Sequence, residues 1–186
     1  MTKVAKIFLA EGFEETEALV PYDILRRGGV NVSLVSVSGS ENVQGAHGVP
    51  IGVHEALTEA AAEAAAEADL LMLPGGTPGT FNLGASETLC GIIAKAAKSG
   101  KVIAAICAAP SVIGKMGLLN GRKATCYPGF EDKLTGARCG GENVVKDGNF
   151  ITGIGPGASF EFGFALLAEL EGEAVVRRVK EQMILR

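Results

Sequence analysis

The chain has 186 residues, of which 47% are hydrophobic and 20% are charged, and its formal net charge is −4. This balance is typical of a globular protein and the length allows one well-filled core, so we expect a single domain over residues 1–186. The acidic pI of about 5.3 and the lack of clustered Lys and Arg argue against nucleic-acid binding. The sequence shows no signal-peptide pattern and no apolar stretch of about 18 residues, so we expect a cytoplasmic protein without a membrane span.

The first half of the chain alternates predicted strands and helices. Residues 31–37 alternate apolar and polar side chains, as a strand does, and the pair Gly28-Gly29 ends the helix before them. Residues 38–50 have the composition of a loop. The run of Ala and Glu that follows favours an exposed helix. The predicted strands are 3–10, 31–37, 51–54 and 70–73, and the predicted helices are 14–27 and 55–69.

The second half continues this alternation and ends in helices. Ser86 is the expected N-cap of one helix, and Asp147-Gly148 favours a hairpin over residues 144–152. The other predicted elements are helices at 87–98, 111–116, 159–170 and 173–183 and a strand at 101–106, whereas residues 123–141 show no clear pattern. The alternation predicts an α/β fold with a mainly parallel sheet and helices on both faces. The apolar runs LLML and VIAAI indicate strands that are buried on both sides.

Cys107 lies where a predicted buried strand turns directly into a helix, and functional groups in such folds gather at this edge of the sheet. The helix dipole and the unpaired N–H groups there favour the thiolate, which is the reactive form. The small Ala108 and Ala109 leave room for a substrate, and the same layout with Ser is a nucleophile elbow. We therefore expect a reactive Cys107 of low pKa. The alternative is a buried cysteine that acts as a small hydrophobe.

Two other motifs fall at the same edge. Gly75-Gly76 follows a strand and presents backbone N–H groups that suit an oxyanion hole, and residues 11–17 (EGFEETE) supply carboxyl groups. Taken alone, the first motif is equally consistent with a tight turn and the second with a solvated acidic loop. Their convergence with Cys107 favours a catalytic site.

Together, these motifs resemble the ThiJ/PfpI superfamily, in the branch of the parkinsonism-associated deglycase and chaperone proteins. The resemblance extends over essentially the whole chain. It implies a flavodoxin-like three-layer sandwich and a homodimer. It also implies that Cys107 is the reactive thiol, that Glu17 is hydrogen-bonded to it, and that the N–H groups of Gly76 and Ala108 form the oxyanion hole. The matching segments are AEGFEETEALVPYDILRRGG, LPGGTPGTFNL, AAICAAPSVI, NVVKDGNFITGIGPGASFEF and the final helical tail.

A carboxylate and a thiolate a few ångströms apart repel each other. A protonated Glu17 that donates to a Cys107 thiolate avoids this repulsion, so we expect the two groups to titrate as one coupled pair. Gly75 is an auxiliary member of this expected site.

The sequence departs from the superfamily at its usual histidines. Many members carry a His where this chain has Tyr127, and the protease-like branch has one where this chain has Ala108. Tyr is a poor general base at neutral pH. His47 remains as a weaker candidate proton carrier, and Cys126 as a thiol that could resolve a sulfenic acid formed at Cys107.

The resemblance implies slow, cysteine-dependent action on small aldehydes or dicarbonyls such as methylglyoxal, by a glyoxalase-like or deglycase-like route. A non-enzymatic redox sensor or holdase chaperone that works through oxidation of Cys107 is the main alternative, and a cysteine protease or amidase is a weaker one. GIGPGAS at residues 153–159 is not a GxGxxG motif and no Walker motif occurs, so we expect no cofactor.

Cys90 and Cys139 indicate no further chemistry. No CxxC motif occurs and neither His lies at ligand spacing from a Cys, so we expect no metal site. A chain of this size does not need disulfides. We therefore expect free thiols, with Cys90 in a helix, either in the core or half-buried, and Cys139 exposed in a loop.

Overall fold

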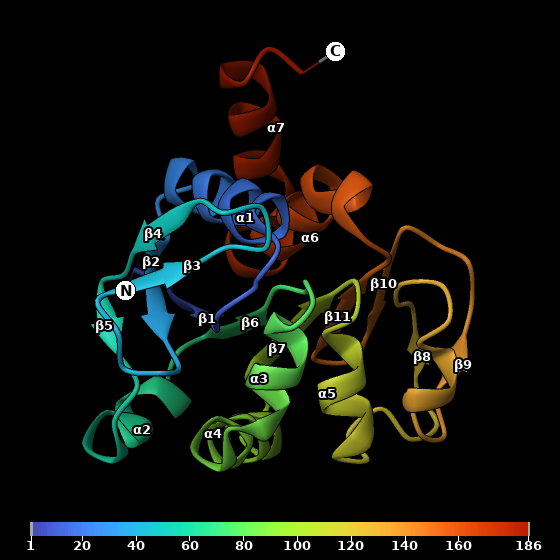
Figure 1. Ribbon diagram of the computed structural model, residues 1–186. Helices are drawn as coiled ribbons and strands as arrows, with labels where there is room; N and C mark the ends of the chain where they lie inside the picture. Colours follow the sequence, from blue (N-terminus) through green and yellow to red (C-terminus); the bar gives the residue numbers. More distant parts are fainter. Residues whose placement is uncertain (1, 186) are drawn as a thin grey trace.

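A seven-stranded sheet forms the centre of the computed structural model, which describes residues 2–185. Its strands are β1 (Val4–Leu9), β2 (Asn31–Ser36), β5 (Glu55–Ala56), β6 (Leu70–Leu73), β7 (Val102–Ile106), β10 (Val144–Asp147) and β11 (Phe150–Gly153). They lie in the order β10-β11-β7-β6-β1-β2-β5 (Figure 1). β10 pairs antiparallel with β11, and all other neighbours are parallel. The predicted α/β fold with a mainly parallel sheet is confirmed.

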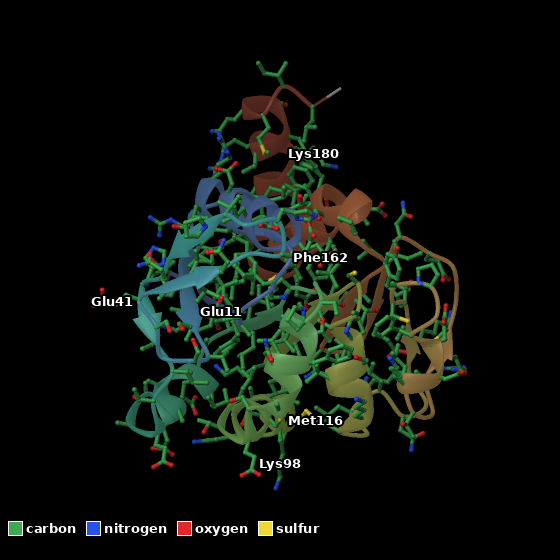
Figure 2. All side chains as sticks on the ribbon, viewed as in Figure 1. Glu11, Glu41, Lys98, Met116, Phe162 and Lys180 are labelled. Atoms are coloured by element: carbon green, nitrogen blue, oxygen red, sulfur yellow. The ribbon has the colours of Figure 1, made fainter. Side chains whose placement is uncertain are left out.

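Helices cover both faces of the sheet, which makes three layers. In Figure 1 the helices above the sheet are α1 (Glu15–Arg27), α6 (Ser159–Glu171) and α7 (Glu173–Gln182). Those below it are α2 (Glu59–Ala66), α3 (Gly79–Ala85), α4 (Glu87–Lys98) and α5 (Pro110–Lys115). Figure 2 shows the same division, with Phe162 on the α6 side of the sheet and Met116 on the α5 side.

The sheet separates two hydrophobic clusters. Successive strand residues point to opposite faces, so Ile7 and Leu9 of β1 pack with Phe162 in one cluster, while Phe8 packs in the other. Every residue of β6 and β7 is buried, as their continuous apolar runs predicted. These two strands carry the glycine pair and Cys107 at their carboxyl ends, so a rigid part of the core positions the candidate site.

The predicted helix over residues 55–69 is wrong at its start. Residues Glu55–Ala56 form β5, which pairs with β2, and the Glu55 carboxylate forms an ion pair with Lys6 of β1. The helix begins only at Glu59, because the Thr58 hydroxyl accepts a hydrogen bond from the Ala61 N–H at 3.2 Å and caps it. Tertiary pairing therefore outweighs the helix propensity of the Ala/Glu run at its first residues.

Several short elements were not predicted. Residues 38–50 contain β3 (Asn42–Gln44), which forms a hairpin with β4 (Pro50–Gly52), where a strand at 51–54 was expected. The helix α3 was missed too. The unclear region 123–141 holds β8 (Lys123–Ala124), β9 (Arg138–Cys139) and the 3-10 turn Glu131–Lys133. Strands of two or three residues are too short to show a periodicity, which explains these omissions.

The predicted local motifs in the second half are confirmed. The Ser86 hydroxyl caps α4 by accepting from the Leu89 N–H at 3.2 Å, and β10 and β11 form the expected hairpin around Asp147-Gly148. Across residues 2–185, none of the helices combines the length and the apolar character that crossing a bilayer requires.

Candidate active site

Cys107 sits on a strained turn between β7 and α5. Its φ of 65° lies in the left-handed region, which a non-glycine residue rarely adopts. Its N–H donates to the Gly153 carbonyl at 2.9 Å and its carbonyl accepts from the Tyr127 N–H at 2.8 Å. Such strain costs about 1–3 kcal/mol and persists only where the surroundings fix it. The two hydrogen bonds fix this turn, and the half-buried side chain lies on the expected nucleophile elbow.

The glycine pair after β6 has no room for side chains. A Cβ on Gly75 would lie 2.7 Å from the Cys107 Cβ and 2.7 Å from Glu17 Oε2. Gly76 has a φ of 96°, and a Cβ there would overlap the Gly12 carbonyl oxygen. Glycine is therefore required at both positions, because the backbone itself forms the wall of the site.

Two backbone donors face the sulfur of Cys107. The backbone N–H groups of Gly76 and Ala108 lie close enough to the thiol to lower its pKa. Within residues 2–185, neither N–H is taken up by a backbone carbonyl. The two N–H groups are therefore left as donors beside the nucleophile, which an oxyanion hole requires.

Glu17 reaches the same point from the first turn of α1. Its side chain is fully buried, and its Oε2 accepts a hydrogen bond from the Gly75 N–H at 2.7 Å. Its other oxygen, Oε1, has no hydrogen-bond partner among the described residues, and Glu17 and Cys107 lie close enough to shift each other's pKa. Burial raises the pKa of Glu17 to about 7. The carboxyl group therefore holds its proton over much of the range in which ordinary carboxylates are ionised.

The low pKa expected for Cys107 is wrong for the thiol beside a charged Glu17. Burial and the negative charge of Glu17 raise the pKa of Cys107 to about 12, against the two N–H donors. A proton on Glu17 removes the repulsion and lets that carboxyl group donate to the sulfur. The thiolate is therefore accessible through the shared proton of the pair.

The segment that contains Cys126 and Tyr127 lies next to the Cys107 turn, because the Tyr127 N–H donates to the Cys107 carbonyl. The Tyr127 side chain is 48% exposed, and its ring lies 3.4 Å from where a Cβ on Gly155 would be. Cys126 is buried in the hydrophobic cluster on the α3–α5 side, whereas Cys107 packs against the opposite cluster. The two thiols therefore pack against different clusters, and Cys126 as a resolving thiol stays a prediction.

The two histidines lie in different surroundings. His47 Nδ1 is 2.9 Å from Glu15 Oε2, and the side chain is 70% exposed. This hydrogen bond to Glu15 raises the pKa of His47. His54 Nδ1 accepts from the Leu34 N–H at 3.0 Å, and its ring stacks on Tyr22. The structure therefore ties His47 to the start of α1.

The four cysteines are free, as predicted, with Cys90 intermediate in burial and Cys139 exposed. Sequence reasoning missed Gly153, whose carbonyl oxygen holds the Cys107 N–H. It also missed the Gly12–Glu14 turn, where the Glu14 N–H donates to the Gly75 carbonyl at 2.9 Å. The glycine-rich run GIGPG marks the first position in the sequence, although its role as a support for Cys107 depends on strand pairing between β11 and β7.

Comparison with known proteins identifies the family. Protein dj-1beta of Drosophila melanogaster is 35% identical over 187 residues, covering 100% of this chain and 98% of that protein. Its crystal structure matches with a TM-score of 0.90 at 34% identity over 100% of both chains. Glutathione-independent glyoxalase DJR-1.2 of Caenorhabditis elegans is 35% identical over 164 residues, 87% of this chain and 85% of that protein.

Some longer relatives contain a similar sequence as one part of their chain. Protein DJ-1 homolog B of Arabidopsis thaliana is 37% identical over 187 residues, which are 100% of this chain and 42% of that protein. The chain thus spans less than half the length of this relative. The family model for the DJ-1/PfpI family matches residues 3–169. The resemblance drawn from the sequence motifs is confirmed, and the chain belongs to the DJ-1/PfpI family.

Proposed function

We propose that this protein converts small reactive dicarbonyls such as methylglyoxal into 2-hydroxy acids, with Cys107 as nucleophile and without a cofactor. The observation that carries the proposal is the convergence of three groups at one sulfur: the buried Glu17 carboxyl and the N–H groups of Gly76 and Ala108. A relative named as a glutathione-independent glyoxalase supports the same reaction class.

In the first step, the Cys107 sulfur attacks the aldehyde carbon of the substrate. A carbon–sulfur bond forms, and the π electrons of the carbonyl group move to its oxygen, where the N–H groups of Gly76 and Ala108 stabilise the charge. That oxygen then takes the proton that Glu17 and Cys107 share. The products are a neutral hemithioacetal and a Glu17 carboxylate.

In the second step, the Glu17 carboxylate acts as a base. It takes the proton from the former aldehyde carbon and returns it to the neighbouring carbonyl carbon, while the hydroxyl proton passes to the second oxygen. The first carbon is oxidised and the second reduced, so the isomerisation needs no external oxidant or reductant. Water then cleaves the thioester, which releases the 2-hydroxy acid and returns one proton to the pair.

We propose that turnover is slow, because Glu17 must serve both steps. A separate, positioned base typically contributes about 10²–10⁴-fold, and Tyr127 occupies the place where many family members carry a His. The Tyr127 side chain is exposed, and its backbone N–H is hydrogen-bonded to the Cys107 carbonyl.

The test is conversion of methylglyoxal to lactate by the purified protein, compared with Cys107→Ala and Glu17→Gln. Cys139→Ala is the matched control, since it removes an exposed thiol away from the site. We expect lactate from the wild type and the control only. Equal lactate formation by Cys107→Ala would refute the proposal.

A different outcome would favour the redox alternative. If the wild type forms no lactate, but peroxide oxidises Cys107 before the other three thiols, the same site is better described as a sensor. We also propose a homodimer, as in the family resemblance, and a cytoplasmic location. Light scattering at several protein concentrations tests the first, and imaging of the tagged full-length protein in cells tests the second.

A further inference from the structure

A cluster of potential metal ligands lies at the start of α1, outside the Cys107 site. It consists of Glu14, Glu15 and His47, whose donor atoms all lie within 4.8 Å of one another. His47 Nδ1 is 2.9 Å from Glu15 Oε2 and 3.5 Å from Glu14 Oε2. In the part of the chain that the structure describes, no other group of His, Cys, Asp and Glu side chains meets this condition. Donor atoms bound to one ion have separations of this order.

The loop that carries His47 is held in place before any ion binds. Glu15 Oε1 accepts from the His47 N–H at 2.8 Å and from the Val49 N–H at 3.5 Å, which leaves Oε2 turned toward the imidazole. Gly45 permits this closure, because a Cβ there would overlap Glu15 Oε1. One carboxylate oxygen thus fixes the loop, and the other is hydrogen-bonded to the imidazole, a contact that an ion held between the two groups would replace.

The two carboxylates are largely withdrawn from solvent, whereas the imidazole is open to it. The Glu14 side chain is 16% exposed, that of Glu15 is 12% exposed and that of His47 is 70% exposed. Two carboxylates held together repel each other, and their position in the first turn of α1 only partly offsets this. A divalent cation would neutralise both, and water could fill its remaining positions on the exposed side.

We propose that Glu14, Glu15 and His47 form a binding site for one divalent first-row transition-metal ion, such as Zn²⁺ or Co²⁺. The donor set of two carboxylate oxygens and one imidazole nitrogen suits these ions, whereas Mg²⁺ and Ca²⁺ prefer oxygen ligands alone. Three protein ligands with open positions are typical of catalytic rather than structural metal sites. The site contains no cysteine, so the absence of CxxC spacing has no bearing on it.

The proposed metal site adjoins the active site through one peptide unit. The Glu14 N–H donates to the Gly75 carbonyl, and the Gly75 N–H donates to Glu17 Oε2. An ion bound at Glu14 is therefore two hydrogen bonds away from the carboxyl group that shares a proton with Cys107. The proposal concerns binding and does not rest on the proposed reaction.

Cobalt(II) titration followed by absorbance tests the proposal on the full chain. We expect one Co²⁺ per chain, with visible bands of oxygen and nitrogen ligation and no thiolate charge-transfer band. Even outer-shell partners contribute about 10–100-fold to metal affinity, so His47→Ala and Glu14→Gln should each weaken binding at least tenfold. His54→Ala, which removes the other histidine of the chain, should bind as the wild type does.

The variant Glu15→Gln shows whether weaker metal binding comes from the loss of a ligand or from a disturbed fold. The amide oxygen of Gln can still accept from the N–H groups of His47 and Val49, so the loop stays closed while one anionic ligand is lost. We expect weaker binding with an unchanged melting temperature. A wild type that binds no Co²⁺, binding that persists in both His47→Ala and Glu14→Gln, or a spectrum dominated by thiolate would each overturn the proposal.

Discussion

The proton held by Glu17 makes a specific prediction about how stability depends on pH. Burial raises the pKa of this carboxyl group from 4.5 to about 7 in the folded chain. The folded state therefore binds the proton more tightly than the unfolded state does. The stabilisation that this gives is fully present below pH 4.5 and is lost as the pH rises through about 7. Glu17→Gln removes the titrating group and keeps an acceptor for the Gly75 N–H.

The size of the effect follows from the difference between the two pKa values. Each pKa unit corresponds to about 1.4 kcal/mol, so between pH 4 and pH 8 the wild type should lose about 3 kcal/mol relative to Glu17→Gln. Glu17 is fully buried, so solvent does not screen this change. Cys107, whose pKa rises from 9.0 to about 12 in the folded chain, contributes a constant amount below pH 8.

Urea unfolding at each pH measures the effect as a difference between the two proteins, in which titrating groups distant from Glu17 cancel. For a chain of this length, about 3 kcal/mol corresponds to roughly 6–12 °C in melting temperature. The control is Glu142→Gln, the same change at an exposed carboxyl group, which should follow the wild type. Parallel pH curves for the wild type and Glu17→Gln would show that Glu17 ionises normally and refute the reasoning.

Three further predictions concern the surroundings of the thiol. Gly75→Ala should destabilise the protein by about 1–3 kcal/mol in urea unfolding, because its Cβ crowds Cys107 and Glu17. Gly91 lies inside α4 with open space around it, so Gly91→Ala should instead stabilise the protein by about 0.5–1 kcal/mol. Equal effects of the two substitutions would show that Gly75 is not tightly packed. Limited iodoacetamide labelling at about pH 8, where Glu17 and Cys107 together hold one proton, should modify Cys107 before Cys139 when read by mass spectrometry, and the reverse order would reject the assignment. Tyr127→His should raise the rate of lactate formation and Tyr127→Phe should not. If Tyr127→His gives no higher rate, the general base for the reaction lies at another residue.

The long, regular elements follow from the sequence because their patterns are strong. The apolar runs of β6 and β7 are long enough to indicate burial on both sides, and the Ser86 cap marks the start of α4. The short strands β3, β8 and β9 exist only because a partner strand pairs with them, and no local pattern reveals that partner. The start of the Ala/Glu helix was misplaced for the same reason.

For the candidate site too, the sequence predicts which residues take part but not all of their contacts. The positions of Cys107, Gly76 and Ala108 follow from the chain order of strand, turn and helix, and the structure brings them together. The direction of the thiol pKa does not follow from that order, because it depends on how deeply α1 buries Glu17 beside the sulfur. Likewise, the loop position of His47 was evident, but its attachment to Glu15 depends on the closure that Gly45 permits.

Burial makes the two members of the pair depend on each other. Beside a charged Glu17, the Cys107 thiol stays protonated at neutral pH, since its pKa is about 12. The Glu17 carboxyl group beside that thiol holds its proton up to a pH of about 7. One proton shared between them gives a protein that carries a single negative charge at the site, and that charge can reside on sulfur whenever Glu17 holds the proton. The proposed reactivity of Cys107 therefore depends on Glu17 as much as on the turn that carries the thiol.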